Sequence, residues 1–431
     1  MSTLNPQAQE LNNIIQQECP AVLRMLSDSG KAIFFPKKGI ISQSADAKGK
    51  RINATIGIAV EDDGSPMRLP TIADAIKLDP QDVFPYASSY GKPELRKIWK
   101  ESIYKKNPSL KANVSLPVVT NALTHGLSMA GFMFVNPGDT LILPDKYWGN
   151  YRLIFQNAYQ AKFKTFNTFQ GEQFDTAAFD DALKTSFGKQ IILLNFPNNP
   201  TGYTPTPAEV EAMVAAIKAS GERGNEVVVL IDDAYFGLVY EDGIYTESIF
   251  SSLADVHENV LAVKIDGATK EDYVWGLRVG FVTYACKGIT DAVCDALVAK
   301  TAGAVRGNIS NVPHISQSLI YQALLFDGYA EEKKEKYGIL KARFEIVKQV
   351  LAENKTKYES CFSPLPFNSG YFMCVQLADG YNSEDVRQVL LKEYSTGVIA
   401  TEQLLRIAFS SVPAALLPDV FDNIFEACQK L

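Results

Sequence analysis

The sequence predicts an α/β fold, in which a large domain with a mainly parallel, mixed sheet flanked by helices is joined to a smaller α+β domain. Between about residues 118 and 284, short segments that are apolar throughout alternate with helical segments, as expected for buried parallel strands. Beyond residue 328, a long charged helix is followed by shorter strands and helices. We expect an N-terminal arm with part of the small domain at 1–60, the large domain at 61–328 and the small domain at 329–431.

The expected strands of the large domain are short, and each is followed by a turn or a helix. They lie at 140–144, 162–166, 191–196, 226–235 and 260–268. The helices between them are expected at 123–135, 147–159, 177–186 and from 207 to near 221. The last of these begins with a capping box, because Thr206 can cap the helix, Pro207 suits its first position and Glu209 can reach back.

The C-terminal part begins with a charged helix at 329–355, which we expect to be a solvated connector. A strand segment at 367–377, a helix at 383–394, a strand at 404–410 and a final helix follow. Internal repeats and low-complexity segments are not found. This mixture of elements predicts the separate α+β unit.

The overall charge and hydropathy exclude several classes of protein. The 431 residues carry 42 Lys and Arg against 49 Asp and Glu, a formal net charge of −7, so no nucleic-acid partner is expected. No stretch approaches the roughly 18 apolar residues of a membrane span, and the N-terminus lacks the pattern of a secretory signal. We therefore expect a cytoplasmic, soluble protein without membrane attachment.

Several common catalytic motifs are missing. The six cysteines contain no CxxC pair and only three histidines occur, so a disulfide framework, a metal site and histidine-based chemistry are not expected. Neither G-x-G-x-x-G nor G-K-[ST] follows a strand, and GLSMA at 126–130 has an alanine where a nucleophile elbow needs glycine. The site must therefore be built from other residues.

Four side chains of different chemistry follow expected strands, namely Trp148, Asn199, Asp232 and Lys270. In open α/β sheets, ligands bind outside the carboxyl ends of the strands, so we expect these side chains to converge. An indole, an amide, a carboxylate and an amine in one crevice suit a planar, charged heteroaromatic ligand. The turn that carries Asn199, NNPTG, contains a proline and a glycine that fix its backbone.

An ordered set of motifs from about residue 52 to residue 406 resembles class I aminotransferases of the aspartate/aromatic type, which depend on pyridoxal phosphate and have the fold type I of such transferases. The motifs are INATIGIAVEDDGSP (52–66), YASSYGKPELR (86–96), PDKYWGNY (144–151), NNPTG (198–202), DDAY (232–235), ATKEDYVWGLRVGF (268–281), RGNISNVP (306–313) and LLRIAFS (404–410). Each motif alone is weak evidence, but the ordered set is specific.

The resemblance implies that Lys270 forms a Schiff base with pyridoxal phosphate, which requires a neutral amine. Arg278 follows eight residues later, as in the family, and is expected to hold the cofactor phosphate as a bidentate pair. Lys264 is the competing lysine, but it lies within an expected strand rather than after it.

The resemblance also assigns Asp232 to the pyridine nitrogen of the cofactor, where a carboxylate keeps the ring protonated. Asp233 is the alternative, and the spacing Asp-x-Ala-Tyr favours Asp232. Tyr235 and Asn199 are expected to bond the phenolic oxygen, and Trp148 to stack on the ring. The predicted catalytic residues are therefore Lys270, Asp232, Tyr235 and Trp148.

The cofactor phosphate is also expected to meet the backbone of TNALTH (120–125) at the N-terminus of a helix. The family commonly has a glycine followed by a hydroxyl residue in this loop, whereas this chain has Ala122 and Leu123. The chain also has Gly267 where the family often has a phosphate-binding serine. Thr124 or Thr269 is the expected replacement.

The substrate residues follow from the same resemblance. Arg406 is expected to hold the substrate α-carboxylate beside Gly57, Asn199 and Trp148. Tyr86 and Ser310 match residues that reach the phosphate of a neighbouring subunit, which implies a homodimer with shared active sites. Arg306 matches the arginine that binds a second carboxylate across that dimer, with a surface arginine as the alternative.

The expected activity is transfer of an amino group between an L-amino acid, either aspartate and glutamate or an aromatic one, and a 2-oxo acid, with ping-pong kinetics. The alternatives are a lyase or a decarboxylase with the same cofactor, because the sequence does not show which bond of the substrate is perpendicular to the ring. A third alternative, a ligand-sensing module with this fold, lacks the expected N-terminal DNA-binding helices.

Overall fold

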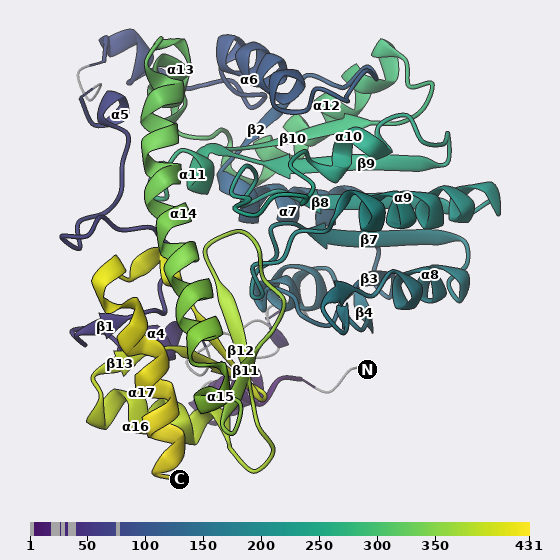
Figure 1. Ribbon diagram of the computed structural model, residues 1–431. Coiled ribbons are helices and arrows are strands. Elements are labelled where there is room, and N and C mark those ends of the chain that lie inside the picture. Colours follow the sequence, from purple (N-terminus) through teal and green to yellow (C-terminus); the bar gives the residue numbers. More distant parts are fainter. Residues whose placement is uncertain (1–3, 19–25, 27–30, 33–39, 75–77) are drawn as a thin grey trace.

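The computed structural model describes residues 4–18, 26, 31–32, 40–74 and 78–431, and its largest element is a seven-stranded sheet (Figure 1). In spatial order its strands are β2 (Val118–Thr120), β10 (Gly280–Ala285), β9 (Val260–Asp266), β8 (Glu226–Asp232), β7 (Lys189–Asn195), β3 (Thr140–Pro144) and β4 (Lys162–Phe166). All neighbouring pairs are parallel except those of β10, which is antiparallel to β2 and β9. The predicted mainly parallel, mixed sheet is confirmed.

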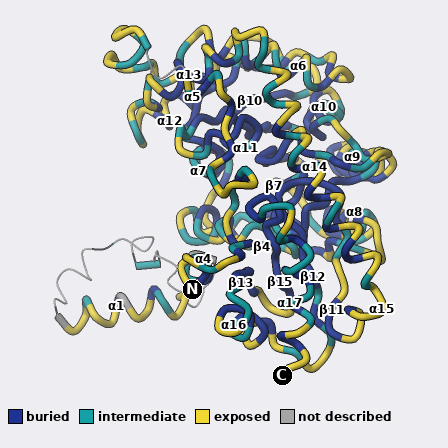
Figure 2. Tube along the Cα trace, turned by 60° about the vertical axis from the view of Figure 1, so that its left-hand side comes forward, coloured by how far each residue is buried: buried dark blue, intermediate teal, exposed yellow. Residues whose placement is uncertain are grey.

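Helices cover both faces of this sheet (Figures 1 and 2), so the central strands β7, β8 and β9 are buried over most of their length. Helix α7 (Ala122–Phe134) crosses β8, β9 and β10. Helices α8 (Thr176–Lys184), α9 (Pro207–Glu222) and α10 (Ile249–Leu253) pack against β4, β8 and β9. The capping box at the start of α9 is present in both directions, as predicted.

One predicted helix of this region is confirmed in part. Within the segment 147–159, residues 150–158 are helical, and most of them form a π-helix, η2 (Arg152–Ala158). Trp148 lies before the helix and lines the cavity described below, whereas Tyr151, at the start of the helix, donates to Asp232. The helix therefore begins later than predicted and has the wider π-type winding.

A second, antiparallel sheet is built from the C-terminal part of the chain. Its order is β11 (Phe362–Pro364), β12 (Met373–Leu377), β15 (Leu404–Ile407) and β14 (Ile399–Thr401), and helices α16 (Ser383–Glu393) and α17 (Leu417–Gln429) accompany it. Strand β1 (Ile52–Asn53) pairs in parallel with β13 (Thr396–Gly397). The beginning of the chain is thereby attached to its C-terminal part.

Helix α14 (Tyr329–Glu353) runs between the two sheets (Figure 1), so it is a connector. The prediction that it is solvated is wrong for one of its faces, where Leu340, Phe344 and Val347 are buried. Arg343 is fully buried and donates to the Ser410 carbonyl at 2.7 Å and to Asp62 at 2.9 Å. Charged residues dominate the sequence of α14, so its row of buried side chains was not recognised from the sequence.

The remaining elements lie at the surface or between the sheets. They are α1 (Pro6–Glu18), α4 (Ile40–Asp46), α5 (Pro70–Asp74), η1 (Pro80–Asp82), α6 (Pro93–Lys106), β5 (Phe169–Gln170), β6 (Gln173–Phe174), α11 (Ala268–Glu271), α12 (Asp291–Ile309), α13 (His314–Leu325), α15 (Lys355–Tyr358), η3 (Phe409–Ser411) and η4 (Ala414–Leu416). Within the described ranges, no helix is both long and apolar enough to cross a membrane.

Candidate active site

A cavity of about 430 Å³ lies where β7, β8 and β9 end, a volume typical of small-molecule sites. Twelve of the predicted site residues line it together. They are Gly57, Ala122, Leu123, Thr124, Trp148, Asn199, Asp232, Tyr235, Thr269, Lys270, Arg278 and Arg406. Gly57 and Arg406, more than three hundred positions apart in the chain, thus line the same cavity, Arg406 from β15 and most of the other residues from the edge of the large sheet.

The turn after β7 holds Asn199 by several independent contacts. The Asn195 side chain accepts from the Asn199 backbone N–H at 2.8 Å. Gly202 has a φ of +74°, and a Cβ at this position would lie 1.9 Å from the Phe372 carbonyl oxygen, so only glycine fits. The Asn199 amide is thereby directed to the Tyr235 hydroxyl, 3.5 Å away.

Asp232 ends β8 and is fixed at the base of the cavity. Its Oδ2 accepts from the Tyr151 hydroxyl at 2.6 Å, and its Oδ1 accepts from the Ala234 backbone N–H at 3.2 Å. Burial raises the pKa of Asp232 to about 6, although the Tyr151 hydrogen bond opposes this rise. A buried carboxylate that is not paired with a cation suits a ligand with a protonated ring nitrogen.

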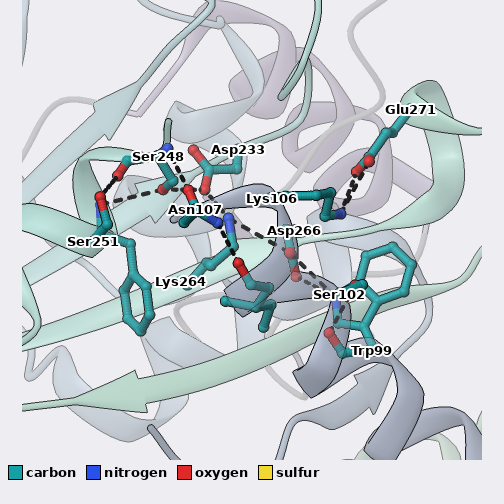
Figure 3. Close-up of polar contacts among 12 residues, drawn as sticks. Trp99, Ser102, Lys106, Asn107, Asp233, Ser248, Ser251, Lys264, Asp266 and Glu271 are labelled. Atoms are coloured by element: carbon teal, nitrogen blue, oxygen red, sulfur yellow. Dashed lines mark hydrogen bonds and ion pairs between the residues drawn. The ribbon is translucent and has the colours of Figure 1, made fainter. Parts of the chain in front are cut away.

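The two rivals considered in the sequence, Asp233 and Lys264, form a buried ion pair with each other (Figure 3). Successive side chains of a strand face opposite sides, so Asp233 points away from the cavity that Asp232 lines. Asp233 also accepts from the Ser248 hydroxyl at 2.6 Å. Neither rival residue lines the cavity, which leaves Asp232 and Lys270 to face it.

Lys270 lies on the short helix α11, just after β9. Its Nζ is 4.6 Å from the centre of the Tyr235 ring. The pKa of Lys270 is lowered to about 8, mainly by burial and in part by the nearby Arg278 guanidinium, whereas Asp232 opposes the change. More of the Lys270 amine is therefore neutral near neutral pH than for an ordinary lysine, as a nucleophile requires.

One end of the cavity is suited to an anion. Arg278 is partly buried, and its Nη1 donates to the Trp275 carbonyl at 3.2 Å. The side chain of the N-cap residue of α7, Asn121, makes no capping bond, so the first-turn amides of Leu123 and Thr124 are open to a ligand. A Cβ at Gly267 would lie 2.6 Å from the Val279 carbonyl oxygen, so the family serine has no room here.

The opposite end is suited to a carboxylate. Arg406, on β15, is 6% exposed, and its guanidinium lies 4.3 Å from the centre of the Phe372 ring. It donates to the Asn199 side chain at 3.2 Å and to the Thr55 carbonyl at 3.1 Å, and its Nε has no partner. Among the described residues, the planar Arg406 guanidinium has only these two long hydrogen bonds, so its N–H groups can also bind a carboxylate in a bidentate manner.

The sequence analysis missed several residues of the site. Tyr151 supports Asp232, and seven further residues line the cavity, namely Ser44, Thr55, Ile56, Asn195, Ala234, Trp275 and Phe372. Ser44 is presented by α4, whose neighbouring Gln43 exchanges two hydrogen bonds with the Ala400 backbone. No local motif indicates Ser44. Tyr151 lies three positions after Trp148, and this spacing could have predicted that both side chains lie near the site.

Three predicted residues lie outside this cavity. Tyr86 is 92% exposed, Arg306 is exposed in the last turn of α12, and Ser310 is exposed at the end of that helix. The Ser310 carbonyl accepts from Ser89 at 2.6 Å. Their predicted contacts with the site of a second subunit stay a prediction.

The arrangement fits pyridoxal phosphate. Arg278 and the N-terminus of α7 suit its phosphate, Asp232 suits its ring nitrogen, Trp148 offers an aromatic face, and Lys270 offers an amine. With the mixed, mainly parallel sheet, this donor set defines a pyridoxal-phosphate-dependent enzyme of fold type I. Among the described residues, no cluster of three or more His, Cys, Asp or Glu is arranged to hold a metal ion.

Comparison with known proteins agrees with this class. The family model "Aminotransferase class I and II" matches residues 52–424. An aspartate aminotransferase of Sulfurisphaera tokodaii is 26% identical over 342 residues, 76% of this chain and 77% of that protein. An LL-diaminopimelate aminotransferase of Aquifex aeolicus is 30% identical over 233 residues, covering 52% and 56%. The crystal structure of an aminotransferase from Anaerococcus prevotii matches 94% of this chain and 99% of its own, with a TM-score of 0.83 and 23% identity.

The chain belongs to the class I and II aminotransferase family, because the family model spans most of its length. It is a pyridoxal-phosphate-dependent aminotransferase, and its substrates are an amino acid and a 2-oxo acid. The recognised resemblance, the fold and the cofactor predicted from the sequence are confirmed.

Proposed function

We propose that Lys270 carries the cofactor and moves the proton during amino-group transfer between an L-amino acid and a 2-oxo acid. The observation that carries this proposal is the buried amine of Lys270, which lies beside Tyr235 and has a lowered pKa of about 8. Lys264 is an unsuitable alternative, because it is held in a buried ion pair with Asp233 outside the cavity. A neutral amine can bind the cofactor, and after its release it can accept the substrate α-proton.

The other residues are proposed to bind and orient. The cofactor supplies an electron sink for the carbanion left by proton removal. Asp232 keeps its ring nitrogen protonated, with Tyr151 fixing the carboxylate. Arg278 and the first turn of α7 hold its phosphate, and Asn199 and Tyr235 bond its phenolic oxygen. Because the same residues would serve both half-reactions, ping-pong kinetics are expected.

The substrate is proposed to be bound at its α-carboxylate by Arg406, with its side chain toward Ser44, Ile56 and Gly57. Among the described residues that line the cavity, Arg278 and Arg406 are the only arginines, and both have roles already. A second carboxylate, as in aspartate or glutamate, would therefore need a cation from outside this chain's cavity. We propose that Arg306 of the partner subunit supplies this cation. Without it, a substrate with an aromatic or other uncharged side chain is preferred.

The proposed assembly is a homodimer with shared sites. Tyr86, Arg306 and Ser310 are exposed on this chain, as residues that serve a second subunit must be. Two further large apolar side chains, Phe84 and Phe132, are 82% and 65% exposed, and exposed apolar groups of this size favour an interface. Sedimentation equilibrium would give the assembly, and the variant Arg306→Gln tests the shared substrate contact.

The test of the whole proposal is an absorbance measurement on the purified holoenzyme, mixed in turn with aspartate, glutamate, phenylalanine and alanine in the absence of a 2-oxo acid. Conversion of the visible band of the lysine-bound cofactor to that of its amine form supports transamination, and the fastest donor identifies the substrate class. Lys270→Ala should abolish the lysine-bound band and lower kcat by about 10²-fold to 10⁴-fold. Release of pyruvate and ammonia from serine, which unlike these four donors has a leaving group on its β-carbon, would instead indicate a lyase.

A further inference from the structure

Charged side chains that do not line the cavity form a second polar cluster (Figure 3). Part of it is the Asp233–Lys264 pair described above. The other part surrounds Glu271, the residue that directly follows Lys270. Glu271 is 7% exposed and does not line the cavity. The proposed chemistry therefore leaves this buried carboxylate without a role.

Two lysines from distant parts of the chain hold Glu271. Lys106, the last residue of α6, binds both of its carboxylate oxygens at 2.9 and 3.1 Å. The Nζ of Lys106 also lies 4.6 Å from the centre of the Trp99 ring, which fixes its position. Lys333, from the second turn of α14, binds Glu271 at 2.9 Å and the next residue, Asp272, also at 2.9 Å. The contacts thus attach the Lys270 segment to two separate helices.

Glu271 with its partners Lys106 and Lys333 is called the clamp below, and the Glu271 carboxylate in it is ionised. Burial alone would raise the pKa of Glu271, but Lys106 and Lys333 outweigh it and lower the pKa to about 2. The same contacts raise the pKa of Lys333 well above its usual range in spite of its burial, because Asp272 and Glu271 face it. Hydrogen bonds between a buried carboxylate and partly buried ammonium groups of this kind are short and directional, so they restrict the backbone to which they are attached.

The Lys270 backbone needs such a restraint. Helix α11 has only four residues, and its N-cap, Gly267, provides no side-chain bond. The Lys270 carbonyl accepts from the Tyr371 hydroxyl at 3.0 Å and, within the same short turn, from the Tyr273 backbone N–H at 3.4 Å. The Lys270 side chain is long and flexible, so the place from which its Nζ can act depends on where its Cα is held.

We infer that Glu271 is a positioning residue: its carboxylate, clamped between Lys106 and Lys333, holds the backbone from which Lys270 reaches the cofactor. The inference rests on the proposed role of Lys270. Displacement of a reacting group by about 1 Å can cost about 10²-fold in rate without changing substrate affinity. Loss of the clamp should therefore lower kcat rather than raise KM.

The test compares Lys333→Met with Lys336→Met in the holoenzyme. Lys336 lies on the same helix three residues later and binds Glu61 and Glu335, at 2.8 and 3.0 Å, without contacting the Lys270 segment. Lys333→Met should lower kcat about tenfold to hundredfold, leave KM within about twofold and shift the visible band of the bound cofactor or its pH titration. Lys336→Met should leave the spectrum and kcat unchanged, even if both variants lose similar stability.

Lys106→Met and Lys106→Arg supply a second, independent comparison, since arginine retains the charge that binds Glu271. The arginine variant should recover most of the kcat and the spectrum that the methionine variant loses. Equal effects of Lys333→Met and Lys336→Met on both kcat and the spectrum, or equal losses in the two Lys106 variants, would overturn the inference. The proposed role of Lys270 fails separately, if Lys270→Ala retains the visible band of the lysine-bound cofactor.

Discussion

Replacement of Asp232 by asparagine should make the cofactor-free protein more stable, although it should damage the enzyme. Asp232 is 3% exposed and bonds to neutral donors, Tyr151 and the Ala234 backbone, rather than to a cation. Its carboxylate is therefore ionised at a cost to the folded state. Asparagine has the same shape and carries no charge to bury: its oxygen can accept from the Ala234 N–H, and its NH2 group can donate to the Tyr151 hydroxyl oxygen, which can accept as well as donate.

The magnitude follows from the pKa of Asp232, which burial raises from 3.8 to about 6. A folded-state pKa above the unfolded value means that the group contributes stability below pH 4, and that this contribution is lost as the pH rises through 6. A rise of about two units corresponds to about 3 kcal/mol. Asp232→Asn should therefore raise the unfolding free energy of the apoprotein by about 3 kcal/mol at pH 7 and have little effect near pH 4.

The assay is denaturant-induced unfolding of the apoprotein at fixed protein concentration, followed by circular dichroism at pH 4 and pH 7. Asp233→Asn is the matched control, because the same substitution one residue later removes one partner of the buried ion pair with Lys264. It should destabilise the protein by about 3–5 kcal/mol. The reasoning is refuted if Asp232→Asn destabilises the apoprotein at pH 7, or if its effect is equal at the two pH values.

Three further predictions concern single contacts. Tyr151→Phe removes a 2.6 Å hydrogen bond that lowers the pKa of Asp232, so the dissociation constant of the cofactor should rise about tenfold. Fluorescence titration measures this constant, and an unchanged value would contradict the role of Tyr151. Arg406→Lys should raise KM for the amino acid tenfold or more and leave cofactor affinity unaltered, as steady-state kinetics and titration can show. Gly202→Ala places a methyl group 1.9 Å from the Phe372 carbonyl and should lower stability by about 2 kcal/mol or more, whereas an unchanged unfolding midpoint would disprove the close approach.

The large sheet and most of the cavity could be predicted because both depend on patterns of short range. Segments such as 191–194 are apolar throughout, which is the property of strands buried on both faces. Parallel strands end at one edge, so Asn199, Asp232 and Lys270 had to lie near one another whatever the details of the connecting helices. The family resemblance then assigned roles, and the structure brings the same residues to one cavity.

The remaining features depend on contacts between distant segments, which no local pattern reveals. The clamp on Glu271 joins positions 106, 271 and 333, and the same charges are equally compatible with a solvated surface in the sequence. Ser44 reaches the cavity because Gln43 binds the backbone of Ala400, more than three hundred residues later. Trp148 belongs to a segment with helical spacing, but it lies before the helix begins, and tertiary packing decides that it lines the cavity.

The walls of the cavity come from two unequal sources. The groups proposed for the chemistry end the strands of the large sheet, whereas Ser44, Ile56 and Gly57 come from a short stretch near the beginning of the chain that attaches to the other sheet. Because the substrate side chain is proposed to lie against that stretch, mutations there should alter which side chain is accepted without changing the proposed catalytic base, Lys270. This separation would allow the substrate preference to change through mutations in one segment near the N-terminus, while the residues proposed for the reaction are retained.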